Sequence, residues 1–400
     1  MDVAVKKRMG DPEMAREINQ ALILGMLRMH DRMSRAEIAQ SLGVSKVTVS
    51  TIVGGLIARR FIAEQGMGTS QESGGRKPIL LSLDTKHVAV IGVDIGTTST
   101  IVAVGNLKGE TLFSQREPTV PSHTLKRITA QVSRLVARAV QEARLPKSGI
   151  IGVGVSVAGI VDGVNGFIHF SPDFEWDDVP IRDILEQETG LRVIVDNCTR
   201  VMALGEKWYG CVKDARNVLY VNVGYGIGSA LIINNRIYDN HSEFGHIPVT
   251  RQKIPCHCGK NGCLEAVASG SALEAQGTGM VPPADGTLSA REMADRARAG
   301  DAAALRAFGG AGRYLGRAIA IATNLLNPDK IIIGGGVSLA ADLLLAPLRT
   351  EFEAQTMEVI RKHARIEIST LGRDAGVRGA IALALNACVF NSALVDGLAT

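Results

Sequence analysis

Short apolar runs rich in Val and Ile alternate with long helical stretches through most of this chain. Each run has the length of a buried strand, and alternating strands and helices are the pattern of an α/β fold. The expected strands are Val88–Asp94, Ile150–Val157, Val193–Asp196, Val218–Val223 and Lys330–Ile333, and the helices between them include Leu125–Glu142 and Ala302–Leu326. Turns rich in Asp and Gly near residues 94 and 224 indicate two related lobes.

The chain is long enough for more than one domain. Four hundred residues exceed the size of an ordinary domain. The pattern changes from helical to strand-rich near residue 82, so we expect one domain at 1–82 and a second at 83–400. The stretch Gly66–Pro78 is rich in Gly and Ser, which indicates a loop or wing near the end of the first domain.

The composition favours a globular protein outside the membrane. Hydrophobic residues make up 46% of the chain and charged residues 21%, which suits a sizeable core. No apolar run reaches the roughly 18 residues that span a bilayer. The basic N-terminus, with Lys6, Lys7 and Arg8, leads into no apolar signal segment. We therefore expect a cytoplasmic protein with no membrane partner.

The excess positive charge lies in the first fifth of the chain. Residues 1–82 hold 12 Lys and Arg against 8 Asp and Glu, whereas the remainder holds 32 of each. A basic first domain is what a polyanion-binding module needs, although so small an excess also arises by chance. Charge alone therefore leaves nucleic-acid binding open.

Residues 20–63 carry the pattern of a helix-turn-helix. After a first helix at Ala21–Met29, Ser34 and Glu37 have the spacing of a capping box that opens a second helix. Gly43 ends that helix with a left-handed turn, because a residue without Cβ adopts positive φ at little cost. A recognition helix is expected next.

That third helix begins after Ser45 as its N-cap and covers Lys46–Val53. Val47, Val49 and Val53 are expected to face inward, whereas polar side chains of the same helix face the major groove. The residues predicted to contact DNA are Arg35, Ser45, Lys46, Thr48, Ser50, Thr51, Arg76 and Lys77, flanked by Arg59 and Arg60. The basic residues of the wing suit phosphates better than bases. A three-helix bundle used for protein contacts is the alternative.

The most specific constellation in the chain has the spacing His-x9-Cys-x-Cys-x4-Cys. Its members are His246, Cys256, Cys258 and Cys263. Three thiolates and one imidazole make a closed tetrahedral set, which suits a structural Zn²⁺ and leaves no position for a catalytic water. Gly259 and Gly262 let the loop over 246–263 fold around the ion, and His257 is expected to point away. Three reduced cysteines without a metal are the alternative.

Five segments carry the motifs of one family. They are Asp94-Ile-Gly-Thr-Thr98, Gly224-Tyr-Gly-Ile-Gly228, Glu243-Phe-Gly-His246, Cys256-His-Cys-Gly-Lys-Asn-Gly-Cys-Leu-Glu265 and Asn327-Pro-Asp-Lys-Ile-Ile-Ile-Gly-Gly-Gly336. With these motifs, residues 15–390 resemble the ROK family of repressors, open reading frames and kinases, and within it the sugar-responsive repressors, such as those for xylose or N-acetylglucosamine. The resemblance implies a winged helix-turn-helix followed by a two-lobed actin-like ATPase fold with a sugar in its cleft.

The resemblance also implies site residues. Sugar contacts fall on Gly159, Asn197, Glu243, His246 and Glu265, where carboxylates and an amide can bond neighbouring hydroxyls. A vestigial nucleotide site falls on Asp94, Gly96, Thr98, Gly226 and Gly335, whose residue types suit Mg²⁺ and phosphate. Taken alone, the glycines also fit ordinary turns, and the carboxylates fit a solvated surface.

Cys198 stands where active members of the family carry the Asp that takes a proton from the sugar. A thiol with a pKa of ~8.5 is mostly protonated at neutral pH and accepts a proton poorly. Ser99 and Tyr225 similarly replace a usual Lys and Thr, and the Tyr ring would crowd a γ-phosphate. The resemblance therefore implies a degenerate sugar kinase with no catalytic residue.

These predictions combine into a DNA-binding transcriptional regulator of carbohydrate genes, expected to be a repressor, controlled by a bound sugar or sugar derivative. Its partners would be a pseudo-palindromic operator, the sugar effector and further copies of itself in a homodimer or homotetramer. The alternative is an ATP-dependent sugar kinase with a fused DNA-binding domain.

Overall fold

The computed structural model describes residues 12–67, 77–240, 242–277 and 288–390. It forms two compact units. Unit 1 comprises Met1–Asn197 and Ala380–Thr400, and unit 2 comprises Cys198–Gly379. The domain boundary predicted near residue 82 lies inside unit 1 and stays a prediction.

The first part of unit 1 is a winged helix-turn-helix, as the sequence predicts; we call it the head. Its elements are α2 (Pro12–His30), β1 (Met33–Ser34), α3 (Arg35–Leu42), α4 (Lys46–Ala58), β2 (Ile62–Met67) and β3 (Ile79–Leu83). The three strands form one sheet in the order β1-β3-β2. The first and third helices are longer than predicted, because α2 starts at Pro12 and α4 continues to Ala58.

Local capping explains where the helices of the head begin and end. The Ser34 hydroxyl accepts from the Glu37 N–H, and the Glu37 carboxylate accepts from the Ser34 N–H, so the predicted capping box is present. Gly43 ends α3 with φ +66°, and Ser45 caps α4 by accepting from the Thr48 N–H. These three predictions are confirmed.

One prediction for the head is wrong. Val49 and Val53 are fully buried, but Val47 is 76% exposed. Two residues apart on a helix are about 200° apart around its axis, so Val47 and Val49 cannot both face the core. Ile52 and Leu56 supply the missing buried positions.

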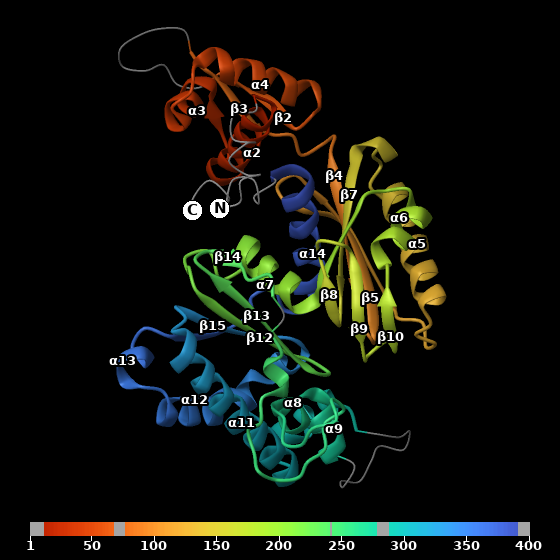
Figure 1. Ribbon diagram of the computed structural model, residues 1–400, viewed down its shortest axis with the longest axis vertical. Coiled ribbons are helices and arrows are strands. Elements are labelled where there is room, and N and C mark those ends of the chain that lie inside the picture. The colour runs from red at the N-terminus through yellow and green to blue at the C-terminus, as the bar shows by residue number, and fades with distance from the viewer. Residues whose placement is uncertain (1–11, 68–76, 241, 278–287, 391–400) are drawn as a thin grey trace. The chain divides into compact units, whose positions relative to one another are not determined.

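The body of unit 1 is a five-stranded sheet in the order β11-β7-β4-β5-β6. Its strands are β4 (Ala89–Ile95), β5 (Ser99–Asn106), β6 (Thr111–Pro118), β7 (Ile150–Val157) and β11 (Val193–Asn197). The helices are α5 (Leu125–Glu142), α6 (Ile181–Thr189) and the short η1 (Lys147–Gly149), and β8 (Ile160–Asp162), β9 (Phe167–Ser171) and β10 (Trp176–Val179) form a second, smaller sheet. In Figure 1, α5 and α6 lie on one side of the main sheet.

The C-terminal segment returns to unit 1. Helix α14 (Ala375–Leu385) begins in unit 2 and ends in unit 1, where it continues as the π-helix η5 (Asn386–Phe390). Its backbone approaches the sheet closely at Gly154, where a Cβ would lie 2.1 Å from the Ala380 carbonyl oxygen. η5 contacts α2, with the Arg28 guanidinium 5.4 Å from the centre of the Phe390 ring.

Unit 2 repeats the strand topology of unit 1. Its sheet, in the order β14-β13-β12-β15-β16, consists of β12 (Val218–Val223), β13 (Ile227–Ile233), β14 (Arg236–Ile237), β15 (Lys330–Gly334) and β16 (Arg365–Ile368). In both sheets three antiparallel strands are followed by two parallel ones. The turns near 94 and 224 join the first two strands of each sheet, which confirms the two related lobes.

Helices cover both faces of the sheet in unit 2 (Figure 1). They are α7 (Cys198–Tyr209), α8 (Leu264–Ala268), α9 (Gly270–Gly277), α10 (Ala290–Arg298), α11 (Ala302–Leu326), α12 (Ala341–Gln355) and α13 (Glu358–Arg361), with short turns η2 (Phe244–His246), η3 (Gly336–Ala340) and η4 (Gly372–Asp374). Alternate residues of β12 face opposite ways: Val221 packs in the cluster that contains α11, and Tyr220 in the cluster that contains α7. The β12 strand is therefore buried on both faces, as its apolar run predicts.

Two helices of unit 2 cross at glycines. At Gly379 of α14, a Cβ would lie 2.0 Å from the carbonyl oxygen of Val201 in α7, and at Gly205 of α7 a Cβ would lie 3.0 Å from the Gly379 nitrogen. The two backbones can approach this closely only because neither residue carries a side chain.

Among the described residues, no single helix is both long and apolar enough to cross a membrane. The pair α3 and α4 passes that test when taken together, but the two helices are bent by 120° at their junction.

We predict that Gly379→Ala destabilises the protein by ~1–3 kcal/mol, because the methyl group must displace the α7 backbone. Gly310→Ala is the matched control. It lies in α11 with nothing within 4 Å of its added Cβ, so it should stabilise by ~0.5–1 kcal/mol. Chemical denaturation of the wild type and both variants measures the free energies of unfolding. Equal denaturation midpoints for Gly379→Ala and Gly310→Ala would show that the close approach at Gly379 does not contribute to stability.

Candidate functional site

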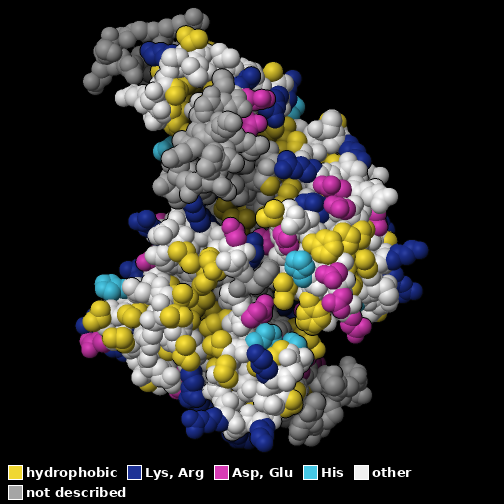
Figure 2. Space-filling model, in the orientation of Figure 1, with side chains coloured by type: hydrophobic (Ala, Val, Ile, Leu, Met, Phe, Trp, Pro, Cys, Tyr) yellow, Lys and Arg dark blue, Asp and Glu magenta, His cyan; other side chains and the backbone are white. Residues whose placement is uncertain are grey.

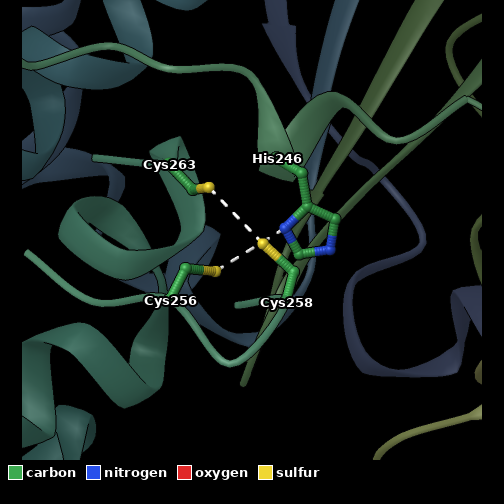
Figure 3. A group of neighbouring side chains, drawn as sticks. All are labelled: His246, Cys256, Cys258 and Cys263. Atoms are coloured by element: carbon green, nitrogen blue, oxygen red, sulfur yellow. Dashed lines mark hydrogen bonds between the residues drawn. The ribbon is translucent and has the colours of Figure 1, made fainter. Parts of the chain in front are cut away.

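Four potential metal ligands converge in unit 2 (Figure 3). His246 comes from η2, Cys256 and Cys258 from the loop that follows it, and Cys263 is the N-cap of α8. The ligand atoms all lie within 4.8 Å of one another, with 3.7 Å between the Cys258 and Cys263 sulfurs and 3.7 Å between Cys256 Sγ and His246 Nδ1. Neighbouring sulfurs around a tetrahedral ion with ~2.3 Å bonds are about 3.8 Å apart. The four residues can therefore hold one metal ion.

The two predicted loop glycines shape this cluster. Gly259 has φ +82° and Gly262 has φ +74°, a region that favours glycine. A Cβ on Gly262 would lie 2.3 Å from the Thr250 carbonyl oxygen. The Cys256 N–H donates to Lys260 O and the Gly259 N–H donates to Cys256 O, so the backbone itself closes the turn.

The thiols differ in their protonation. Burial raises the pKa of Cys256 to about 12 and also raises the pKa of Cys263. The backbone N–H of Lys260 lowers the pKa of Cys258. A metal binds thiolates, so it must displace protons from the two buried thiols, and its affinity falls as the pH falls.

Glu265 lies directly beside the cluster and is almost fully buried. Its Oε2 accepts from the Ile227 N–H at 2.7 Å, and a Cβ on Gly226 would lie 2.4 Å from the same oxygen. Its Oε1 makes no hydrogen bond with good geometry to the protein, although His257 Nε2 lies 3.0 Å away. A buried carboxylate oxygen with spare accepting capacity suits a ligand hydroxyl.

His246 has its two ring nitrogens in different surroundings. Nδ1 faces the thiols, whereas Nε2 lies 3.9 Å from Glu243 Oε2. The Glu243 side chain is 57% exposed. Unit 2 thus brings together all three of its predicted sugar-contacting residues, Glu243, His246 and Glu265.

The other two predicted sugar-contacting residues belong to unit 1. Gly159 adopts φ +129°, and its carbonyl oxygen accepts from Asn197 Nδ2 at 2.8 Å. Cys198, the first residue of α7, belongs to unit 2. Its thiol lies 3.9 Å from the Thr199 hydroxyl.

The predicted nucleotide-binding turn of unit 1 is held by several hydrogen bonds. Ser156 donates to the Asp94 carboxylate at 2.6 Å, and desolvation raises the pKa of Asp94. The Gly96 carbonyl accepts from the Thr119 hydroxyl, and the Thr98 carbonyl accepts from the Thr119 N–H. Asp94, Gly96 and Thr98 therefore occupy one ordered strand-to-strand turn.

The equivalent turn of unit 2 contains Gly226 and the exposed ring of Tyr225. Gly335, the other predicted nucleotide contact, has φ +85°, and a Cβ there would lie 2.4 Å from Asn222 Oδ1. That oxygen is buried without a hydrogen-bond partner. Side chains are thus excluded at Gly335 by its backbone angle and by its contact with β12.

The predicted DNA-contacting residues of the head are mostly exposed. Ser45, Lys46, Thr48, Ser50 and Thr51 line the outer face of α4 and the turn before it. Arg35 is ion-paired with Glu64 at 2.9 Å, which links α3 to β2. Lys77 is exposed, and Arg76 lies outside the described residues.

Sequence reasoning missed the placement of His257. Its ring lies outside the Cys3His set, as predicted, but its Nε2 lies 3.0 Å from Glu265 Oε1, nearer than His246 Nδ1 at 3.8 Å. The distance between these residues in sequence hid the contact, because only the folded loop brings position 257 back to position 265.

Comparison with known proteins identifies both parts of the chain. The model of the ROK family matches residues 90–387. The chain belongs to the ROK family. The model of the MarR family matches residues 17–68, which lie in the winged helix-turn-helix head.

Relatives of this ROK protein include regulators and kinases. The xylose repressor of Caldicellulosiruptor bescii is 28% identical over 392 residues, covering 94% of this chain and 98% of the relative. The glucokinase of Halalkalibacterium halodurans is 37% identical over 305 residues, covering 72% of this chain and 92% of the relative. A solved structure of a ROK family transcriptional regulator, a homologue of the E. coli MLC protein, matches with a TM-score of 0.81 at 25% identity, covering 96% of this chain and 98% of that one.

We predict that the purified ROK protein carries about one metal ion per chain and that Cys258→Ser lowers this content strongly, because one of four ligands is lost. Cys211→Ser is the control, since Cys211 lies outside the cluster and hydrogen-bonds Glu206. Elemental analysis after gel filtration measures the metal. A wild-type protein without metal after purification in zinc-supplemented medium would contradict the assignment.

Proposed function

We propose that this protein is a DNA-binding transcriptional regulator, expected to be a repressor, of carbohydrate genes. The observation that carries the proposal is that one chain contains both a winged helix-turn-helix and a ROK body. This chain matches a xylose repressor along almost its whole length. The match to a solved ROK transcriptional regulator covers the same two parts. A cytoplasmic location goes with this proposal.

The recognition surface of the proposed regulator is the outer face of α4. Short polar side chains on its first turns can approach base edges in the major groove. We propose that Arg35 and Lys77 contact phosphates, and Arg35 would exchange its ion pair with Glu64 for a phosphate oxygen. We assign Arg76 to the wing contacts from sequence alone.

The proposed effector is a sugar or sugar derivative, and the residues proposed to contact it are those that the family resemblance implies. Gly159 and Asn197 would contribute from unit 1, and Glu243, His246 and Glu265 from unit 2. A ligand shifts a conformational equilibrium of the protein only toward the state that it binds more tightly. That preference is how the sugar would control DNA binding.

We propose that the metal is a structural Zn²⁺. Three cysteine ligands favour zinc, and four protein ligands close the coordination sphere. The ion would hold His246 and, two residues beyond Cys263, Glu265 in the geometry that accepts sugar hydroxyls. Zinc therefore supports effector recognition and takes no part in a reaction.

We propose a catalytically degenerate body, with Cys198 in place of the proton-accepting carboxylate and a vestigial nucleotide site at Asp94, Gly96, Thr98, Gly226 and Gly335. The second candidate function, an ATP-dependent sugar kinase with a fused DNA-binding domain, is favoured by the 37% identity to a glucokinase. The ordered Asp94 turn also suits phosphate and Mg²⁺.

A pseudo-palindromic operator requires at least two heads, so we propose a homodimer or homotetramer. Exposed hydrophobic side chains gather on unit 2 over α12 and α13 in Figure 2. Met357, the N-cap of α13, and Val359 within it are each more than half exposed. Apolar side chains gathered on a surface are frequent where subunits meet.

We predict that Lys46→Ala weakens binding to duplexes selected from a random-sequence library by several-fold and lowers the salt dependence by about one counterion. Lys126→Ala, an exposed lysine on α5, serves as the control and should leave affinity unchanged. Fluorescence anisotropy at several salt concentrations measures both effects. Failure of the wild-type protein to enrich any duplex would refute DNA binding.

We predict that one member of a panel of aldoses, amino sugars, polyols and their phosphates raises the melting temperature, while the wild-type protein with ATP and Mg²⁺ phosphorylates none of them at an ordinary kinase rate. Cys198→Asp should raise any residual transfer by a factor of ~10²–10⁴ if the missing base is the main defect. Cys198→Ser, which adds no carboxylate, should not. Wild-type turnover above about 1 s⁻¹ would establish the kinase instead.

A further inference from the structure

One apolar side chain stands among the polar ones on the outer face of the recognition helix. Val47, the second residue of α4, is 76% exposed. The buried residues of the helix, Val49, Ile52, Val53 and Leu56, all lie on the opposite side of its axis. Val47 therefore points directly away from the core of the head.

The hydroxyls of Ser45, Thr48 and Thr51 make hydrogen bonds within α4 and its N-cap. Thr51, one turn further along the same face, donates its hydroxyl to the Val47 carbonyl at 3.1 Å. Thr48 and Ser45 share a hydrogen bond of 2.8 Å between their hydroxyls. Because the Thr51 hydroxyl donates to the backbone, its methyl group and the Val47 side chain lie on the same face of α4 and form a small apolar spot one residue after Lys46.

The head itself gives no reason for a valine at this position. An exposed β-branched residue is a poorer helix former than alanine, and at this exposure Val47 buries little apolar surface. A methyl group that covered Val47 in a complex would add the free energy of burying its exposed apolar surface.

The target of a recognition helix offers one apolar group that matches. Among the four base pairs, only those with thymine present a methyl group in the major groove. The residues at the start of a recognition helix are those that reach base edges. The excess positive charge of residues 1–82 favours a nucleic acid over an apolar protein surface as the partner of this face.

We infer that Val47 is a specificity-determining residue that packs against the 5-methyl group of a thymine at one position of each operator half-site. The inference rests on the proposed DNA-binding function. Thr51 extends the contact with its own methyl group, and Lys46 anchors the same helix turn on the phosphate backbone.

The test replaces one methyl group at a time in the DNA. The full-length protein first selects duplexes from a random-sequence library. In the best of these, each thymine is then replaced by deoxyuracil, which lacks only the 5-methyl group. For the wild type, one position per half-site should lose about fourfold in affinity, the effect of one buried methyl group.

In Val47→Ala the same replacement should have no effect, while the other thymines behave as in the wild type. Val164→Ala is the matched control, because Val164 is an 86% exposed valine in the turn between β8 and β9, outside the head. Circular dichroism should show both variants folded, since neither removes a buried side chain.

The outcomes separate the two proposals. If no duplex is enriched, the DNA-binding function fails and the inference fails with it. If duplexes are enriched but Val47→Ala keeps every deoxyuracil penalty of the wild type, the function stands and the thymine contact is refuted. Equal loss in Val47→Ala across all duplexes, without a position-specific effect, also overturns it, because a contact that is independent of sequence is made to the sugar-phosphate backbone and not to a thymine methyl group.

Discussion

The convergence of one imidazole and three thiols organises a part of unit 2 that has little apolar packing of its own. In the stretch 247–262, the buried hydrophobic side chains are Val249 and the ligand Cys256. The loop holds its shape through glycine turns, backbone hydrogen bonds and the ligand cluster, and through the cluster it positions Glu265 against the β12–β13 hairpin. A carboxylate almost fully buried there carries a desolvation cost that the Ile227 N–H and a ligand hydroxyl can offset.

Local rules were sufficient for much of the fold. The capping box of Ser34 and Glu37, the left-handed Gly43 and the apolar strands all follow from short-range geometry, and the sequence shows them directly. The predicted inward placement of Val47 is wrong because the 3.6-residue period of a helix sets Val47 and Val49 on opposite sides of α4. The error mattered, since the exposed position changes the chemistry of the recognition face.

Contacts between segments that are distant in sequence could not be predicted from the sequence. Nothing local indicates that Arg35 is neutralised by Glu64 or that His257 turns toward Glu265. The clustering of His246, Cys256, Cys258 and Cys263 is an exception, because their spacing in sequence is itself typical of a metal site. In the sequence, the repeat of one strand topology shows only as two similar turns. The strand order of the two sheets is needed to recognise the repeat itself.

The chain passes between its two units at only two points, and both are tied to the crossing of α7 and α14. The first passage lies between Asn197 and Cys198, at the start of α7, and the second lies inside α14 after Gly379. Gly205 of α7 and Gly379 of α14 approach each other within unit 2, so both passages start from helices whose backbones are in close contact. Beyond Gly379, α14 continues into η5, and η5 contacts α2 of the head within unit 1. One continuous helical segment therefore connects the helix crossing of unit 2 with the winged helix-turn-helix by covalent bonds.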